Sequence, residues 1–476
     1  MRDLVRRPLV TCGPRASAVE VARRLSREGV GSVVVVDADG APAGIVTDRD
    51  LRGKVVAEGR DPRTVEAASI MSTPLVTIAG DAFVFEAVLE MTRRHIRHLV
   101  VVDGARAIGV VSSRHVLVFD TTHPVTLARE IGRAASLESL AGLARRITEL
   151  VRQLVDDGGS AYDVGQIVAE LNDRLVLRVL DLTLDTLAVA GETPPPVPWC
   201  WIALGSEARR EQTLRTDQDN ALVYADPPEE LSESAARFYR RFAEGAIAGL
   251  VSVGFPSCPG GSMASNPRWC QPLAVWRGYF HDWMTTSSPT HVLDASIYFD
   301  LRPLAGAREL AATLSGLTRS EAPERRGFLG TVARDVVSRP LPLTIFGNVR
   351  VPRDGTHPGA VDVKGGGSLQ LVGAARLLAL QLGLAETNTV DRFRAAGAAG
   401  ALGALDVGEI TDAFQHLLRL RLRRQLEQLE RGQAPDNLVA PDALSHADAL
   451  LFRDALQTVR KVQGAIRERF ATDFLP

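Results

Sequence analysis

The sequence predicts a mixed α/β protein in three parts: an α/β pair of repeats, a central α/β domain preceded by helices, and a mostly helical C-terminal domain. Three observations lead to this prediction. A strand–turn–strand pattern occurs twice in the first quarter of the chain, two apolar runs flank a Gly-Ser turn near residue 205, and helical spacing of apolar residues dominates the last third. With 476 residues, the chain is long enough for about three domains.

Composition is that of an ordinary globular protein. Hydrophobic residues make up 45% and charged residues 24%, and the net charge of -2 provides no bulk field that would favour nucleic acid or an anionic membrane. No apolar run approaches a membrane span and no signal-like segment is visible, so we expect a cytoplasmic protein. The four cysteines form no CxxC pair, which argues against a zinc site and a disulfide scaffold.

The N-terminal repeat begins with a valine run at 33–36, followed by a turn and a second apolar run that starts at Gly44. The second copy has its apolar run at 99–102 and its second strand from Gly109. A helical pattern precedes each copy, so each reads as helix, buried strand, turn, strand, helix. Two such half-units would bury each other's apolar faces in one domain, which we assign to residues 1–122.

This repeat resembles a tandem pair of CBS domains. The resemblance implies an adenosine-nucleotide sensor, in which a Thr or Ser and an Asp three residues later contact ribose and phosphate. Thr47 and Asp50 match in the first copy, and Ser112 matches in the second, where His115 replaces the Asp. One nucleotide site is therefore favoured over two. A purely structural or dimerising pair remains open, Asp50 could instead cap a helix, and we expect a homodimer.

The second part, residues 123–304, begins with helical spacing from 127 to about 190 and continues with the apolar run 199–204. That run ends in Gly205 and Ser206. Glycine allows the backbone to approach a phosphate closely, and the serine hydroxyl adds a hydrogen-bond donor. A short polar helix after the turn would offer unpaired N–H groups to the same anion.

Asp217 and Asp219 open the next apolar run. If they begin a strand, both point to one face, because side chains alternate along a strand. Two neighbouring carboxylates repel each other unless a cation lies between them. Magnesium commonly takes one or two carboxylates together with substrate phosphates. The segment therefore predicts a site for Mg²⁺ and a nucleoside triphosphate.

Gly-Ser, a spacer and Asp-x-Asp together resemble the signature of the nucleotidyltransferase superfamily. The string 205–211 is similar to the corresponding stretch of the uridylyltransferases that modify the nitrogen-regulatory PII protein, and Arg209 matches a basic position of that motif. The resemblance implies Mg²⁺-dependent transfer of a nucleoside monophosphate from an NTP to an acceptor, with a protein acceptor as in PII uridylylation, under regulation by the CBS pair.

Two alternatives to this transferase remain. The first is a catalytically silent protein that senses nucleotides and takes part in signal transduction, against which the intact Asp217 and Asp219 argue. The second, a transferase acting on nucleic-acid ends, is disfavoured because no basic surface with interleaved aromatic residues is visible.

A third carboxylate is expected from the segment 294–302, which reads as a strand with an Asp near each end. We favour Asp300, because the residues around it resemble the family's later strand. Asp294 would share its face at the far end of the strand. Either residue could instead cap the strand or pair with Arg302.

Three features of the remaining sequence bear on the site. The Gly- and Pro-rich loop 251–270 is of the kind that lies over ligands, although an ordinary surface turn is an alternative. Lys364 precedes three glycines, which indicates either a phosphate contact or a tight turn. The third part, 305–476, carries two long helical patterns at 413–431 and 443–470. It resembles the helical C-terminal domain of the same nucleotidyltransferase group. The basic face of its first long helix reads as solvated, or as paired with the acids Glu427 and Glu430, rather than as a nucleic-acid surface; its residues are Arg419, Arg421, Arg423 and Arg424.

Overall fold

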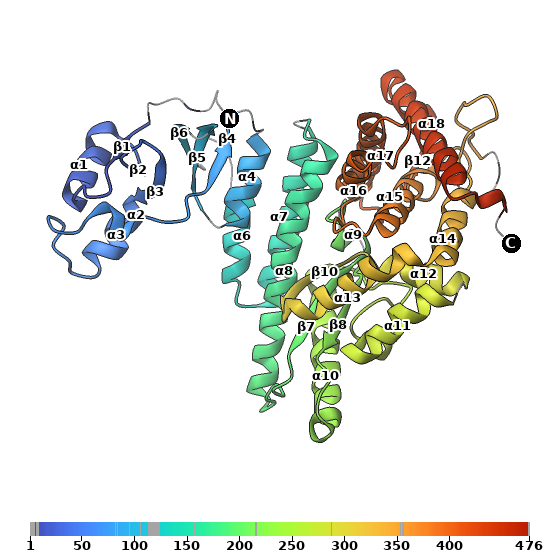
Figure 1. The fold of residues 1–476 in the computed structure, drawn as a ribbon, viewed down its shortest axis with the longest axis horizontal. Helices are drawn as coiled ribbons and strands as arrows, with labels where there is room; N and C mark the ends of the chain where they lie inside the picture. Colours follow the sequence, from blue (N-terminus) through green and yellow to red (C-terminus); the bar gives the residue numbers. More distant parts are fainter. Residues whose placement is uncertain are drawn as a thin grey trace. The chain divides into compact units, whose positions relative to one another are not determined.

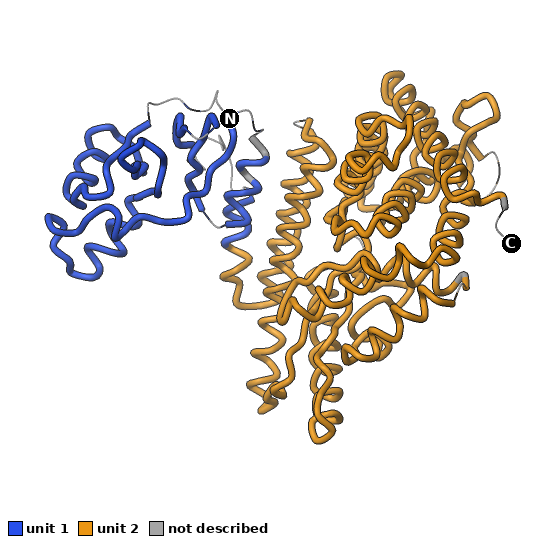
Figure 2. The backbone as a smooth tube through the Cα atoms, in the orientation of Figure 1, with its two compact units in different colours: residues 1–129 blue, residues 130–476 orange. Residues whose placement is uncertain are grey.

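The computed structural model describes residues 5, 9–80, 82, 84–94, 96–104, 106–112, 124–156, 158–214, 217–286, 288–352, 354 and 357–474. The chain forms two compact units, residues 1–129 and 130–476 (Figure 2). The sequence analysis expected three parts. The difference arises because the second and third of these parts share one continuous hydrophobic core.

Unit 1 contains the predicted repeat, and each copy has one more strand than the sequence pattern indicated (Figure 1). In each copy a short first strand lies parallel to the second, and the third is antiparallel to the second. The first copy contains β1 Thr11–Cys12, α1 Ala18–Glu28, β2 Ser32–Val36, β3 Pro42–Thr47, α2 Asp48–Leu51, η2 Arg52–Val56 and α3 Ala67–Ile70. The second contains β4 Thr77–Ala79, α4 Val84–Arg93, β5 His98–Asp103 and β6 Arg106–Ser112.

The two copies pack against each other through a small apolar cluster that includes Val34 of β2 and Val100 of β5, both fully buried. Within the first copy, Gly44 leaves room for Met71, whose sulfur would lie 2.6 Å from a Cβ at Gly44. The pairing of the two half-units expected from the sequence is thus present.

Unit 2 opens with the helices predicted for residues 127–190. They are α6 Pro124–Arg133, α7 Leu137–Asp156 and α8 Ala161–Val189, and the boundary between the two units falls within α6. Helix α8 has a serine N-cap: the hydroxyl of Ser160 accepts the N–H of Asp163 at 3.2 Å.

A four-stranded sheet lies at the centre of unit 2, in the order β10-β7-β8-β9. The central strand β7 is buried on both faces. Trp199 and Trp201 stack edge-on against Phe242 of α10, while Cys200 and Ile202 point into the core that α11 and α13 cover. The elements are β7 Trp199–Leu204, α9 Gly205–Ala208, β8 Asn220–Tyr224, α10 Glu229–Val253, η3 Pro267–Trp269, β9 Cys270–Pro272, α11 Leu273–Thr285, α12 Pro289–Tyr298, β10 Leu301–Gly306 and α13 Arg308–Glu321.

The strand predicted for 294–302 is wrong over most of its length. Residues 289–298 form helix α12, and strand β10 begins only at Leu301. Ser288 caps this helix by accepting the N–H of His291 at 3.1 Å. A serine followed by proline is a strong helix start, and here it outweighs the strand-like composition of the segment.

The C-terminal part is helical, as predicted, and it packs on the sheet-bearing part through the shared core (Figure 1). No helix in the described part of the chain combines the length and apolar character that crossing a membrane requires. The elements are η4 Ala322–Glu324, α14 Arg326–Ser338, β11 Val361–Asp362, η5 Lys364–Ser368, α15 Leu369–Leu382, α16 Thr389–Ala398, α17 Val407–Glu430, β12 Leu438–Val439, η6 Pro441–Ala443, α18 His446–Arg469 and η7 Thr472–Phe474.

Candidate active site

Asp217 and Asp219 lie in the extended segment that leads directly into β8. The backbone pairing between β7 and this segment includes Asp219, because the N–H of Leu204 donates to the carbonyl oxygen of Asp219 at 2.9 Å. Gln218 and Asn220 are buried, whereas Asp217 is exposed and Asp219 is partly exposed. This alternation places the two carboxylates on one face, as predicted, although just before the strand.

Gly205 brings the turn after β7 against this carboxylate pair. Its φ of 54° is left-handed, and a Cβ at this position would lie 3.1 Å from Oδ2 of Asp219. Ser206 is half-buried, and its hydroxyl makes no hydrogen bond to the residues that the structure describes. The polar helix expected after this turn is the single turn α9, so its dipole contributes less than the sequence analysis assumed.

The loop after α10 runs alongside the same segment. The N–H of Gln218 donates to the carbonyl of Pro256 at 3.1 Å, and that of Asn220 donates to the carbonyl of Ser262 at 3.0 Å. Within the loop, the thiol of Cys258 hydrogen-bonds to the carboxylate of Asp219. The loop thus borders the site, as the sequence analysis favoured. The role of Cys258 was missed, since nothing in its local sequence indicates contact with Asp219.

The site holds its carboxyl groups in an environment that disfavours charge. Burial raises the pKa of Asp219, although Cys258 and Lys364 oppose the effect. Burial also raises the pKa of Glu207 to about 8, with further contributions from the negative charges of Asp173 and Asp219. A bound cation is the usual remedy for such a concentration of carboxyl groups.

Lys364 comes from the C-terminal part of the chain but contributes to the electrostatics of this site. Burial lowers the pKa of its amine, as does the neighbouring Arg421, while Asp219 and Asp217 raise it. The side chain is exposed to solvent as a whole. Its backbone forms the tight turn that the sequence left as an alternative, because Oδ1 of Asp362 accepts the N–H groups of Lys364 and Gly365, each at 2.9 Å.

The residues around Asp217 fit Mg²⁺ of the kind that completes its shell with substrate. Two carboxylates share a face beside a glycine cradle, with room left by the missing Cβ of Gly205. Among the described residues, no group of three or more His, Cys, Asp or Glu side chains could hold a metal by itself. A site of this type therefore depends on phosphate oxygens as further ligands.

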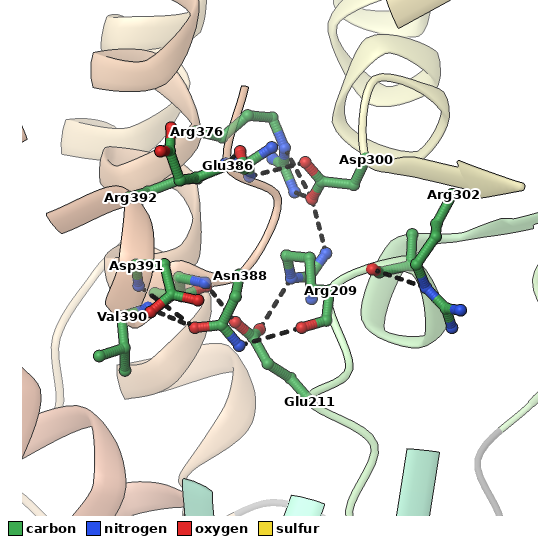
Figure 3. A network of polar contacts seen from close by, with 12 residues as sticks. Arg209, Glu211, Asp300, Arg302, Arg376, Glu386, Asn388, Val390, Asp391 and Arg392 are labelled. Atoms are coloured by element: carbon green, nitrogen blue, oxygen red, sulfur yellow. Dashed lines mark hydrogen bonds and ion pairs between the residues drawn. The ribbon is translucent and has the colours of Figure 1, made fainter. Parts of the chain in front are cut away.

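The carboxylate of Asp300 lies at the centre of a buried ionic cluster (Figure 3), while its backbone carbonyl accepts the N–H of Gly205 at 3.1 Å. Its Oδ2 accepts hydrogen bonds from Arg209 and Arg376, both at 2.7 Å, and Oδ1 lies 2.7 Å from Nη1 of Arg392. The side chain is 0% exposed. Burial alone would raise the pKa of Asp300, but the three guanidinium groups outweigh it and hold the pKa well below its usual range. Both oxygens of this carboxylate lie against guanidinium groups, and its expected role as a third metal carboxylate stays a prediction.

Arg209, the residue predicted to contact the donor nucleotide, belongs to the same cluster, and that contact stays a prediction. Arg209 is buried, and its guanidinium pairs with Glu211 at 2.8 Å as well as with Asp300. Glu211 in turn accepts the N–H of Thr389, and Asn388 donates to the carbonyl of Arg209 at 3.0 Å (Figure 3). The motif residues therefore join the catalytic segment to α16 of the C-terminal part.

The sequence analysis left open whether Asp300 or Asp294 pairs with Arg302. Arg302 does not pair with Asp300. It makes a two-pronged contact with Asp173 of α8, with both hydrogen bonds at 2.8 Å. Asp294 of α12 pairs with Arg268 at 2.8 Å. Contact of Asp294 or Asp300 with a metal at the Asp217 face stays a prediction.

In unit 1, the capping interpretation of Asp50 is confirmed. Thr47 is the N-cap of α2, and Oδ2 of Asp50 accepts both its N–H, at 2.9 Å, and its hydroxyl, at 2.7 Å. Lys54 lies 2.9 Å from the other oxygen. Ser112 ends β6 in the second copy. His115 lies outside the described residues, and nucleotide contact by Thr47, Asp50 and Ser112 stays a prediction.

Models of three protein families match successive regions of the chain, in the order of the three parts predicted from the sequence. Residues 1–57 and 67–120 match CBS domains. Residues 145–290 match the family described as "Putative nucleotidyltransferase DUF294", and residues 326–470 match a "Putative nucleotidyltransferase substrate binding domain".

Individual proteins are similar over shorter stretches. An uncharacterized protein of Methanopyrus kandleri is 38% identical over 27% of this chain and 66% of its own length. The CBS domain-containing protein YhcV of Bacillus subtilis is 30% identical over 24% of this chain and 79% of its own length. A solved CBS domain protein of Pyrobaculum aerophilum, in complex with AMP, is 31% identical over 27% of this chain and 97% of its own, with a TM-score of 0.24.

The chain spans just under two thirds of the length of the M. kandleri protein. A CBS domain-containing protein of Arabidopsis thaliana is 27% identical over 26% of this chain, and the match covers only 23% of that protein's own length. The family models, by contrast, cover most of the chain between them, in the order CBS pair, catalytic region and C-terminal domain. The chain therefore belongs to the CBS-domain-containing members of the family described as "Putative nucleotidyltransferase DUF294".

Proposed function

We propose that the protein is a Mg²⁺-dependent nucleotidyltransferase that moves a nucleoside monophosphate from an NTP to an acceptor, under control of an adenosine nucleotide at the CBS pair. One observation carries the catalytic part. Asp217 and Asp219 share a face beside the Gly205–Ser206 turn, and the amine of Lys364 is close enough to affect the pKa of Asp219. Carboxylates for a metal thus lie next to donors for phosphate.

Each residue then has a separate task. Asp217 and Asp219 would hold Mg²⁺, which when bound supplies charge neutralisation to the phosphate oxygens. Gly205 lets the backbone approach the β- and γ-phosphates, and the unpaired hydroxyl of Ser206 can donate to them. Lys364 adds a point charge on the same anion. Catalysis would rest on positioning and charge stabilisation.

The reaction is an in-line displacement at the α-phosphorus. An acceptor oxygen forms the new P–O bond, the bond to the β-phosphate bridge breaks, and pyrophosphate leaves with the electron pair. The proton of the acceptor passes to solvent. A protein acceptor is proposed on the resemblance to the PII uridylyltransferases, and the 326–470 domain, matched as substrate-binding, is the candidate to present it.

The experiment that tests this function supplies the protein with each labelled NTP in turn, with Mg²⁺ and a cell lysate, and identifies labelled products. We expect label on one macromolecular class, release of pyrophosphate, and loss of both when Mg²⁺ is chelated. A protein that binds adenosine nucleotides but labels nothing with any NTP would support the silent sensor instead.

A further inference from the structure

We infer that Arg421 of α17, together with Lys364, binds the β- and γ-phosphates of the donor, so that the C-terminal domain completes the triphosphate site. This inference rests on the proposed function. It adds a residue that the sequence analysis treated as part of a solvated basic helix face, and it gives the C-terminal domain a part in holding the donor as well as the acceptor.

Arg421 is a buried cation without a carboxylate partner. It is 7% exposed, and its Nε donates to Oδ1 of Asn437. No acidic group of the described residues forms an ion pair with its guanidinium. Asp362 is the acid that acts on it electrostatically, and Oδ1 of that carboxylate accepts the N–H groups of Lys364 and Gly365. The outer nitrogens of Arg421 are therefore available to an external anion.

Asn437 places this guanidinium next to the Lys364 turn. While its side chain accepts from Arg421, its backbone carbonyl accepts the N–H of Val363 at 2.9 Å. Asn437 thus joins the side chain of Arg421 to the backbone of Val363, the residue before Lys364. The ammonium group of Lys364 likewise makes no hydrogen bond or ion pair with the part of the chain that the structure describes.

The face of α17 that carries Arg421 also meets the catalytic segment. Gln425 lies one helical turn further along the same face, and it accepts a hydrogen bond from Thr213 at 2.7 Å. Thr213 belongs to the segment that leads from the Gly205 turn to Asp217. One contact thus holds the Arg421 side chain beside the Lys364 turn, and a second joins the next turn of α17 to the segment before Asp217.

The charge balance at this place calls for an anion. Arg209 is already paired with Glu211 and Asp300, whereas Arg421 and Lys364 form no ion pair with the residues that the structure describes, although Asp362 acts on Arg421 and Asp219 and Asp217 act on Lys364 at longer range. Burial lowers the pKa of Arg421 to about 10, although Asp362 opposes the effect. A buried charge without a partner is destabilising. A triphosphate would remove that cost, and a guanidinium offers it a planar set of donors.

The test measures the affinity of the full-length protein for inorganic tripolyphosphate with Mg²⁺, by calorimetry. This probe carries the phosphates without a base, so it avoids adenosine recognition by the CBS pair. We expect Arg421→Gln and Lys364→Gln each to weaken binding at least about 10-fold, in line with loss of a charge-assisted hydrogen bond. Arg421→Lys should recover part of the loss. Arg419→Gln, on an exposed position of the same helix, should bind like the wild type.

Unchanged affinity in Arg421→Gln, or no binding by the wild type, would overturn the inference. If Arg421→Gln does not fold, Lys364→Gln decides, because its exposed side chain can be replaced without opening the core. The experiments distinguish failure of this inference from failure of the proposed function. Tripolyphosphate binding that depends on Arg421, in a protein that transfers no nucleotide, would leave the anion site standing and remove the reaction.

Discussion

Asp217 and Asp219 can be neutralised without disturbing the packing around them, because one is exposed and the other partly exposed. Asp217→Asn or Asp219→Asn should reduce nucleotide transfer by about 100-fold or more, since the charge that holds the metal is lost. Transfer of labelled NMP gives the effect, and thermal unfolding shows that the fold is intact. Asp282→Asn, an exposed site on α11, is the matched control. Normal turnover by the double variant would contradict the assignment.

Glu207 predicts a dependence of stability on pH. Its pKa rises from the usual 4.5 to about 8 on folding, so the folded state binds a proton that the unfolded chain releases. The resulting stability is present below about pH 4.5 and is lost as the pH rises through about 8. In Glu207→Gln, the free energy of unfolding should therefore change less with pH over this range, by a few kcal/mol at most. The variant should be more stable than the wild type at pH 9. Urea unfolding at pH 5, 7 and 9 gives both profiles, and parallel curves would contradict the expected pKa.

At the scale of single residues, the sequence predicted those parts of the site that are close together along the chain. The Gly205–Ser206 turn and the Asp217–Asp219 pair follow from local spacing. Cys258 and Arg421 could not be found in this way, because their roles depend on which distant segments the fold brings to the site. Asp300 was found by its motif, but its partners Arg376 and Arg392 lie on helices whose approach no local pattern shows.

At the scale of elements, Asp300 ties the start of β10 to α15 and α16. Asp300→Asn removes the negative charge shared by three buried guanidinium groups, and should lower the free energy of unfolding by about 3–5 kcal/mol. Asp294→Asn is the control, because its partner Arg268 is half exposed and such pairs contribute about 1 kcal/mol or less. Urea denaturation compares the two. Equal effects would show that the cluster is not the tie between these elements.

The elements themselves were largely predictable where periodicity is long. The helices α7, α8, α17 and α18 and the strands β7 and β8 follow the patterns seen in the sequence. Helix α12 was missed because its ten residues read equally well as a strand, and only the cap at Ser288 distinguishes the two. The two-residue strand β1 and the three-residue β4 are too short for any pattern, and exist because a neighbouring strand pairs with them.

At the scale of the whole molecule, a helix crosses the boundary between the two units. Helix α6 runs from Pro124 to Arg133, and the units divide at residue 129. A helix transmits rotation, which a flexible tether does not. An adenosine ligand that favours one arrangement of unit 1 should therefore change the affinity of unit 2 for the donor, by a factor of roughly 5–150 at typical couplings of about 1–3 kcal/mol.

Reciprocity allows this coupling to be measured without an acceptor. The donor NTP must shift the affinity of the CBS ligand by the same factor, which titration calorimetry can measure in both directions. The donor could also bind at the CBS pair itself. A parallel titration of Asp50→Asn, a variant that keeps an acceptor for the helix cap, distinguishes that binding from binding at unit 2. Equal affinities with and without saturating donor would show that the units are only tethered.

The shared core of unit 2 also has a consequence for the nascent chain. The strands of the sheet are complete at Gly306, but α18, which closes the core, ends at Arg469. At about 5–20 residues per second, roughly 10–30 s of synthesis separate the two. Unit 1 closes its own core within the first 129 residues and can fold meanwhile. On the ribosome unit 1 is thus complete before unit 2, so under the proposed function no molecule would acquire a working transferase site ahead of the domain pair that would regulate it.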